Sequence, residues 1–310
     1  MITETTYLEE QAYVLENEHL QVTVVPALGS NVMRIFDRYT KQDILRSPAT
    51  REEREQRKTV YGTPVLFPPN RMEDATFTYR GVTYALEMNR AKENVHIHGF
   101  VQELPWNVQE VQAANTTLTT VLHSKDHASI LSQFPHDFSL EMTITLQGQD
   151  VIQTLTVKNH GDEPMPCGLG YHTTFHFPKG SKLAIDIEQQ WELNERHLPT
   201  GTLLPVKEAT AFKQGRVLDG VALDDVYVMT QDRKAVITTP HDTTITYSTN
   251  ERFTQWVLFT ASGDEELLAI EPYSWVTNAP NLAQLPATLT GMDEVAGHRN
   301  KVYETKITVK

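Results

Sequence analysis

The sequence predicts an all-β protein built as one large antiparallel β-sandwich. Short segments in which apolar and polar residues alternate are the commonest local pattern, and turn residues separate them at close intervals. Convincing amphipathic helices are scarce, which disfavours an alternating α/β fold. The 310 residues contain no internal repeat or low-complexity linker, and large sandwiches often reach this length as one unit. We therefore expect a single domain over residues 1–310.

The clearest predicted strands form a hairpin in the middle of the chain. Residues at every second position before and after the turn at 148–150 share one face of each strand. Turn residues at 159–164 then end the second strand. The shared faces are Leu140, Met142, Ile144 and Leu146 on the first strand, and Val151, Gln153, Leu155 and Val157 on the second.

Other segments rich in Thr, Val, Tyr and Ile have the same strand character. They lie at residues 20–25, 76–86, 117–123, 182–187, 235–239, 244–248, 255–260 and 302–309. Helix is expected only in the charged stretch near residue 50 and at residues 282–285.

The charge balance argues against nucleic-acid and membrane partners. The chain has 27 Lys and Arg against 40 Asp and Glu, a formal net charge of −13, which repels phosphate unless a local basic patch exists. The densest basic stretch, residues 46–58, also carries Glu52, Glu53 and Glu55, so we interpret it as a solvated helix or loop.

The single cysteine and the chain start point to a reducing compartment. Cys167 cannot form an intramolecular disulfide. Residues 1–10 lack the basic start and apolar run of a signal peptide, and no stretch has the apolar length of a membrane helix. We expect a soluble cytoplasmic protein, and monomer and homodimer both stay open.

Motifs for the common cofactors are missing. The sequence has no Gly-rich phosphate loop and no zinc motif. His96 and His98 alternate like a metal pair on a strand, but no third ligand has a recognisable spacing. Cys167 lies between Pro166 and Gly168 and is interpreted as a small packed residue. We expect neither a metal nor a cofactor.

Two early segments carry polar residues at the ends of apolar runs. In residues 61–71, two prolines stiffen the exit and Asn70 and Arg71 follow; this is either a surface turn or a rigid platform for a polyhydroxy or anionic ligand. In residues 94–106, His98 is followed by Trp106, a flat aromatic that could contact a sugar face or pack in the core.

Two later segments are stronger candidates for chemistry. His172 follows Gly168 and Gly170, which would allow a ligand or another backbone to approach, although it could be a satisfied core histidine. Glu271 ends an apolar strand directly before a proline, so its backbone is extended and its burial is costly unless the carboxylate is used or paired. Asp224 and the following aspartate are a weaker case of the same kind.

These segments occur in a characteristic order along the chain. The motifs are GTPVLFPPNR, HIHGF with a following tryptophan, GLGYHTTF, LPTG, LDDVY and IEPYSWVTNAPN. In this order and spacing the chain resembles the aldose 1-epimerase (galactose mutarotase) family over about residues 10–310. The resemblance implies a β-supersandwich fold that binds a sugar in an open cleft without a cofactor or metal.

The resemblance also implies roles for individual residues. Glu271 matches the general base that acts on the anomeric hydroxyl, and His172 matches the general acid on the ring oxygen, although Thr-Thr-Phe follows it where Pro-Tyr-Phe is common. His98 and Asp224 match sugar-contacting positions. Asn70 and Arg71 match an Asn-Arg-Ile segment that here ends in methionine.

One acid and one base are enough for mutarotation, because opening the ring needs a proton removed from the C1 hydroxyl and another delivered to the ring oxygen. We expect an ionised Glu271 and a protonated His172, with Asp224 supporting the imidazolium.

Three alternatives stay open. The first is a hexose-6-phosphate epimerase that would use Arg71, Arg80 and Arg90. The second is a sugar-binding protein without catalysis. The third is a lyase or hydrolase with Asp224 facing Glu271.

Overall fold

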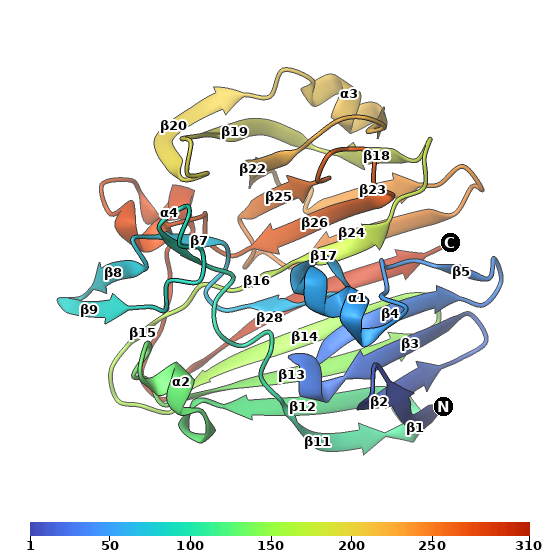
Figure 1. The fold of residues 1–310 in the computed structure, drawn as a ribbon, viewed down its shortest axis with the longest axis horizontal. Coiled ribbons are helices and arrows are strands. Elements are labelled where there is room, and N and C mark those ends of the chain that lie inside the picture. Colours follow the sequence, from blue (N-terminus) through green and yellow to red (C-terminus); the bar gives the residue numbers. More distant parts are fainter.

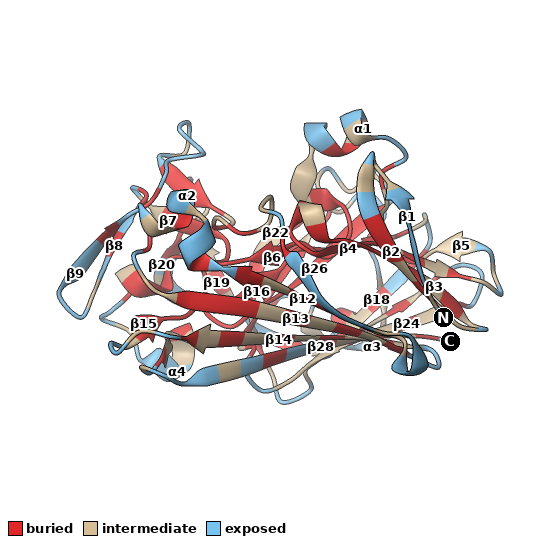
Figure 2. Ribbon diagram, turned by 90° about the horizontal axis from the view of Figure 1, so that it is seen from below, coloured by how far each residue is buried: buried red, intermediate tan, exposed pale blue.

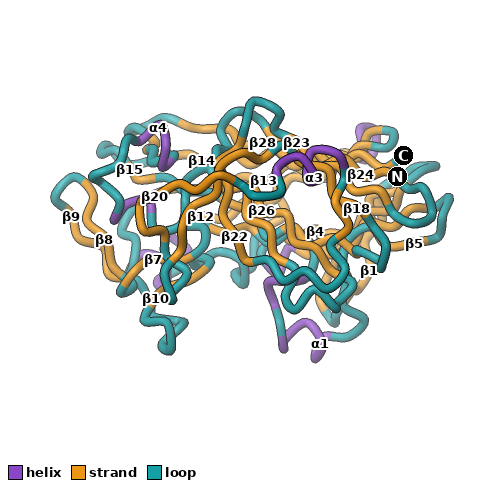
Figure 3. The backbone as a smooth tube through the Cα atoms, turned by 90° about the horizontal axis from the view of Figure 1, so that it is seen from above, coloured by secondary structure: helices purple, strands orange, loops and turns teal.

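The computed structural model describes residues 1–310 and consists mainly of antiparallel strands. Helices are short and lie at the periphery of the strand framework (Figure 3). They are α1 (Arg51–Gln56), α2 (Ala128–Leu131), α3 (Ala209–Gln214) and α4 (Ala287–Thr290), with 3-10 turns at Pro26–Leu28, Lys58–Val60, Ala113–Asn115, Ser124–Asp126 and Ala279–Asn281. The all-β prediction is confirmed. The longest α-helices have six residues, so none of the helices could cross a lipid bilayer.

Two large sheets and one smaller sheet form the body of the molecule (Figure 1). The nine-stranded sheet has the order β11 (Asn107–Gln112), β12 (Thr117–His123), β13 (Phe138–Gln147), β14 (Asp150–Asn159), β28 (Asn300–Val309), β24 (Thr244–Thr249), β23 (Lys234–Thr238), β18 (Lys182–Ile185) and β21 (Arg216–Val217). The eight-stranded sheet has the order β20 (Pro199–Pro205), β19 (Ile187–Leu193), β22 (Asp224–Met229), β25 (Gln255–Phe259), β26 (Leu267–Tyr273), β16 (Gly170–Tyr171) and β6 (Val65–Leu66), and β17 (Thr173–His176) also pairs with β26.

The smaller sheets complete the framework. The five-stranded sheet runs β1 (Ile2–Tyr7), β2 (Glu10–Glu16), β3 (Leu20–Val25), β4 (Asn31–Asp37) and β5 (Gln42–Asp43) in chain order. Three two-stranded pairs are β7 (Arg71–Glu73) with β10 (Val95–Ile97), β8 (Thr76–Tyr79) with β9 (Val82–Ala85), and β15 (Met165–Pro166) with β27 (Glu294–Val295). Both chain termini lie on the same side of the molecule (Figure 1).

The predicted central hairpin and the predicted shared faces of its strands are confirmed. Leu140 pairs with Val157 and Leu146 with Val151 across β13 and β14. The predicted shared faces of both strands are buried, because alternate side chains point into the space between the sheets.

One hydrophobic cluster of 67 buried residues joins the sheets. It contains Leu140 and Leu155 from the nine-stranded sheet, Ile270 and Trp256 from the eight-stranded sheet, and Val22 from the five-stranded sheet. The strands are buried where the layers face each other (Figure 2). All three sheets therefore contribute to one apolar core.

Two predicted elements differ in the structure. Residues 76–86 form the hairpin of β8 and β9, because Arg80 and Gly81 both adopt positive φ and turn the chain back. The predicted helix at 282–285 is wrong: it lies directly before Pro286, whose ring disfavours helical backbone in the preceding residue, and α4 begins only after that proline.

Candidate active site

Neighbouring strands place Glu271 and His172 side by side. Glu271 lies in β26, and His172 lies between β16 and β17, which both pair with β26. Thr173 pairs with Ile270, so the antiparallel register brings the preceding His172 opposite Glu271. His172 Nε2 lies 3.4 Å from Glu271 Oε1, and both side chains are buried.

A cavity of about 620 Å³ opens above this pair. Six of the seven predicted site residues line it: Asn70, Arg71, His98, His172, Asp224 and Glu271. The walls include the segment from α1 through Val60 on one side and Asn89, Arg90 and Ile97 on the other, and α1 projects from the body of the sheets (Figure 2).

Trp106, the seventh predicted residue, does not line this cavity. It is 3% exposed and belongs to the hydrophobic core, while its backbone amide donates to Pro26. The structure therefore places it in the core, the alternative that the sequence left open.

The environment of Glu271 favours the protonated carboxyl. Burial raises the pKa of Glu271 to about 8, and the charge of Asp224 adds to the increase. The Tyr273 hydroxyl donates a hydrogen bond to Oε2 and, with Arg71, lowers the pKa in the opposite direction. Asn70 Nδ2 donates to the Tyr273 oxygen at 3.4 Å. Burial dominates, so near neutral pH Glu271 holds its proton.

The environment of His172 favours the neutral imidazole. Burial lowers the pKa of His172 to about 4, and the positive charge of Arg57 acts in the same direction. His172 Nδ1 lies 3.3 Å from the Thr174 hydroxyl oxygen. The proton of the pair is thus on Glu271, the reverse of the ionised Glu271 and protonated His172 expected from sequence.

Asp224 does not pair with His172 in the structure. Its Oδ2 lies 3.7 Å from Arg71 Nη2 and 3.3 Å from His197 Nδ1. The expected support of the imidazolium by Asp224 is therefore corrected: this carboxylate orients groups at the cavity wall.

Left-handed backbone brings His98 and Asn70 together. Both residues have positive φ, 65° for His98 and 53° for Asn70, and the His98 amide donates to the Asn70 carbonyl at 2.9 Å. The His98 and His172 ring centroids are 5.4 Å apart in an edge-on arrangement. Burial and the neighbouring His172 hold the pKa of His98 well below its usual value. His98 Nδ1 is buried and has no hydrogen-bond partner within the protein.

The three arginines considered for an anionic substrate separate. Arg71 and Arg90 line the cavity, whereas Arg80 binds Glu294 elsewhere. Arg71 Nε donates to Glu93 at 2.9 Å.

The stretch at 46–58 also differs from its interpretation as a solvated segment. Arg54 is 1% exposed, and its Nη2 lies 2.5 Å from Glu103. Arg57 and Lys58 line the cavity. No sequence pattern indicated this role, because only the fold brings the segment to the cavity.

Sequence reasoning gave Tyr273 no role beside Glu271. It lies two residues after Glu271, so both side chains are on the same face of β26, a signal that was readable in the sequence. A Cβ on Gly170 would lie 2.3 Å from the Tyr273 ring. Gly170 therefore makes room for an aromatic ring, and Gly168 does the same for Trp275, where we had expected a ligand or another backbone.

The two histidines that alternate on a strand, His96 and His98, lie in different surroundings. His96 Nδ1 lies 2.6 Å from the Glu87 carbonyl oxygen, while His98 faces the cavity, and no cluster of three His, Cys, Asp or Glu side chains could hold a metal ion. Burial raises the pKa of the Cys167 thiol to about 12, as expected for a packed cysteine.

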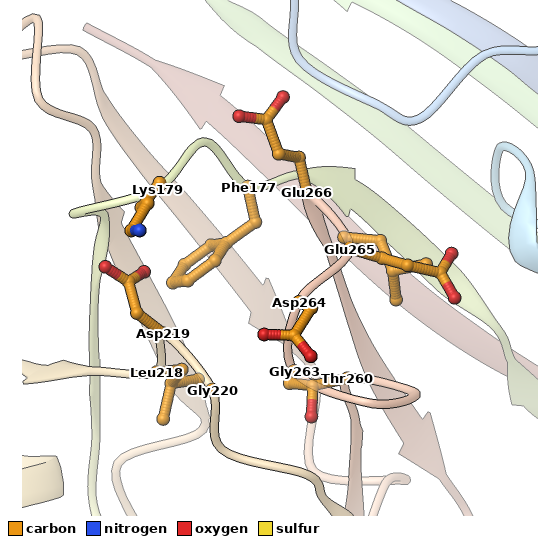
Figure 4. A pocket seen from close by; sticks show the side chains of 11 residues that line it. Phe177, Lys179, Leu218, Asp219, Gly220, Thr260, Gly263, Asp264, Glu265 and Glu266 are labelled. Atoms are coloured by element: carbon orange, nitrogen blue, oxygen red, sulfur yellow. The ribbon is translucent and has the colours of Figure 1, made fainter.

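A second cavity, of about 360 Å³, contains none of the predicted site residues (Figure 4). Four of its eleven lining residues are acidic, and two of these carboxylates already have partners: Asp219 accepts from the Gly180 amide, and Glu265 accepts from Arg46 and Arg57. It offers no paired acid and base.

The chain is similar in sequence and in fold to several known proteins. The family model described as Aldose 1-epimerase matches residues 11–284. A galactose mutarotase-like protein from Clostridium acetobutylicum is similar over 100% of this chain and 98% of its own, with 25% identity and a TM-score of 0.93. Galactose 1-epimerase from Lactobacillus acidophilus shares the fold, with 14% identity, coverage of 100% and 98%, and a TM-score of 0.80. The Escherichia coli K12 protein YihR is 24% identical over 225 residues, 70% of this chain and 71% of YihR.

Proposed function

Because the family model covers most of its length, the chain belongs to the aldose 1-epimerase family, and we propose that it interconverts the α and β anomers of a hexose. The observation that carries this proposal is the buried Glu271–His172 pair, 3.4 Å apart at the base of a polar cavity. His98, Asp224, Asn70 and Arg71 surround it with the hydrogen-bonding groups that a polyhydroxy ligand needs.

The pair can open and close a sugar ring with one proton. In the reactive state, the Glu271 carboxylate accepts the C1 hydroxyl proton while the His172 imidazolium donates its Nε2 proton to the ring oxygen. Breaking the bond from C1 to the ring oxygen gives the aldehyde, and the pair is left as a protonated Glu271 and a neutral His172. Rotation about the C1–C2 bond followed by the reverse transfers gives the other anomer, so no net proton is consumed.

The environments of Glu271 and His172 favour the protonation state that acts on the open-chain aldehyde. With the pKa of Glu271 raised to about 8 and that of His172 lowered to about 4, the pair holds the protonation state that ring closure requires. Before a closed sugar ring can open, the proton must move from the Glu271 carboxyl to the His172 imidazole. This transfer is short, because Oε1 and Nε2 are 3.4 Å apart.

Four cations at the cavity favour a second candidate substrate, a hexose 6-phosphate. Arg57, Lys58, Arg71 and Arg90 all line the cavity. No ion pair within the protein involves Arg90, whereas Glu265, Glu103 and Glu93 pair with the other three. An unpaired guanidinium at the rim suits a phosphate distant from C1.

Anomer exchange tests the proposal. We would follow fresh α-D-glucose and α-D-galactose by polarimetry and equilibrated glucose 6-phosphate by saturation-transfer NMR, with wild type beside Glu271→Gln. We expect acceleration of at least one sugar and a loss of about 10²–10⁴-fold in the variant, with sugar binding retained. A folded wild type that accelerates none of them would reject the proposal and favour a binding protein without catalysis. An Arg90→Gln variant that lost only the phosphorylated substrate would establish the second candidate.

A further inference from the structure

Thr174 contacts the side of the His172 ring opposite Glu271. The two residues are two positions apart and project from the same face, so the Thr174 hydroxyl lies 3.3 Å from His172 Nδ1. Thr174 is fully buried, and the chain is fixed around it, because its amide donates to the Gly62 carbonyl and its carbonyl accepts from the Arg46 amide.

The neighbouring carbonyl indicates the direction of this contact. A threonine hydroxyl has one proton, and the His172 carbonyl oxygen, 3.2 Å away, can only accept it, whereas Nδ1 can either accept or donate. With the hydroxyl proton directed to the carbonyl, the hydroxyl oxygen accepts from the ring and Nδ1 carries the hydrogen. A neutral imidazole with hydrogen on Nδ1 has a bare Nε2, and this is the nitrogen that faces Glu271 Oε1.

We propose that Thr174 is a positioning residue that holds His172 in the Nδ1–H tautomer, so that Nε2 exchanges a single proton with Glu271 and with the sugar ring oxygen. This inference rests on the proposed function and deepens it. The transfer is balanced: the carboxyl O–H bond breaks as the Nε2–H bond forms, which gives carboxylate and imidazolium. In the other tautomer Nε2 already carries a hydrogen, and it can accept no proton from Glu271 or from the ring oxygen during closure.

The adjacent threonine provides a matched control. Thr173 is also fully buried, and its hydroxyl contacts the Tyr247 hydroxyl at 2.8 Å and not the imidazole. Thr173→Val therefore removes a buried hydroxyl next to His172 without removing the contact to Nδ1.

Nitrogen NMR of histidine-labelled protein tests the proposal without needing activity. We expect the neutral His172 of the unliganded wild type, identified by its loss in His172→Asn, to show a protonated Nδ1 and an unprotonated Nε2. Thr174→Val should shift this tautomer and lower kcat about three- to tenfold with little change in KM. Thr174→Ser should restore both properties, and Thr173→Val should keep the wild-type tautomer.

Two results would overturn the inference. One is a wild-type His172 that carries its hydrogen on Nε2, and the other is a Thr174→Val protein with an unchanged tautomer. If Thr174→Val does not fold, the wild-type and Thr174→Ser spectra still decide the tautomer. Failure of the proposed function would appear separately, as a wild type without anomer exchange whose His172 still has the predicted tautomer.

Discussion

Replacing Tyr273 with phenylalanine should raise the pH at which activity falls on the alkaline side. The Tyr273 hydroxyl donates to Glu271 Oε2, and this bond stabilises the carboxylate form. A hydrogen bond to a charged group contributes about 1.5–3 kcal/mol, and one pKa unit corresponds to about 1.4 kcal/mol. Losing the bond should therefore raise the pKa of Glu271 by about one to two units above its value of about 8.

The assay is the pH dependence of anomer exchange. A pair that works with one shared proton gives a bell-shaped profile, because uptake of a second proton below about pH 4 and loss of the shared proton above about pH 8 each leave it inactive. Tyr273→Phe should move the alkaline limb upward and leave the acidic limb in place.

Tyr171→Phe is the matched control for this prediction. Its buried hydroxyl contacts only the Met142 sulfur, at 3.9 Å, so both limbs should stay where they are in the wild type. An alkaline limb that does not move in Tyr273→Phe, or that moves downward, would refute the reasoning about Glu271.

Three further predictions concern affinity and stability. Asp224→Asn leaves Arg71 and His197 without their shared carboxylate and should raise KM about tenfold with a smaller change in kcat, as steady-state kinetics would show; an unchanged KM would remove Asp224 from the site. The pKa of Glu271 is about 8 in the folded protein, above its ordinary value of 4.5. The contribution of this shift to stability is fully present below about pH 4.5 and is lost as the pH rises to about 8. Urea titrations should therefore show Glu271→Gln gaining stability relative to wild type between about pH 5 and about pH 9, and a constant difference would contradict the shift. Trp106→Phe should destabilise the core by about 1–3 kcal/mol in thermal unfolding and leave KM within about twofold; a large rise in KM would return Trp106 to the sugar site.

Sequence patterns predicted the parts of the fold that depend on local periodicity. The period-two faces of β13 and β14 are readable because each strand buries one face only, and their register follows from a short turn. The pattern did not predict the turn within residues 76–86 or the absence of helix at 282–285. In each case one residue, Arg80 or Pro286, overrides the surrounding pattern.

The candidate site was predictable from the sequence where a residue whose burial costs free energy stands among apolar residues. Glu271 and His172 were named for that reason, and both lie in the cavity. Their protonation was not predictable, because it depends on burial by segments far away in sequence. Arg57 illustrates the same limit: its charge lowers the pKa of His172, although the two residues are far apart in the chain.

The measurement that tests the central claim most directly compares Glu271→Gln, His172→Asn and the double variant by saturation-transfer NMR of anomer exchange. Groups that share one proton act as a unit, so each single variant should lower kcat by about 10²–10⁴-fold and the double variant should be about as slow as the slower single one. A double variant whose loss equals the product of the two single losses would show that Glu271 and His172 act independently, which contradicts the account.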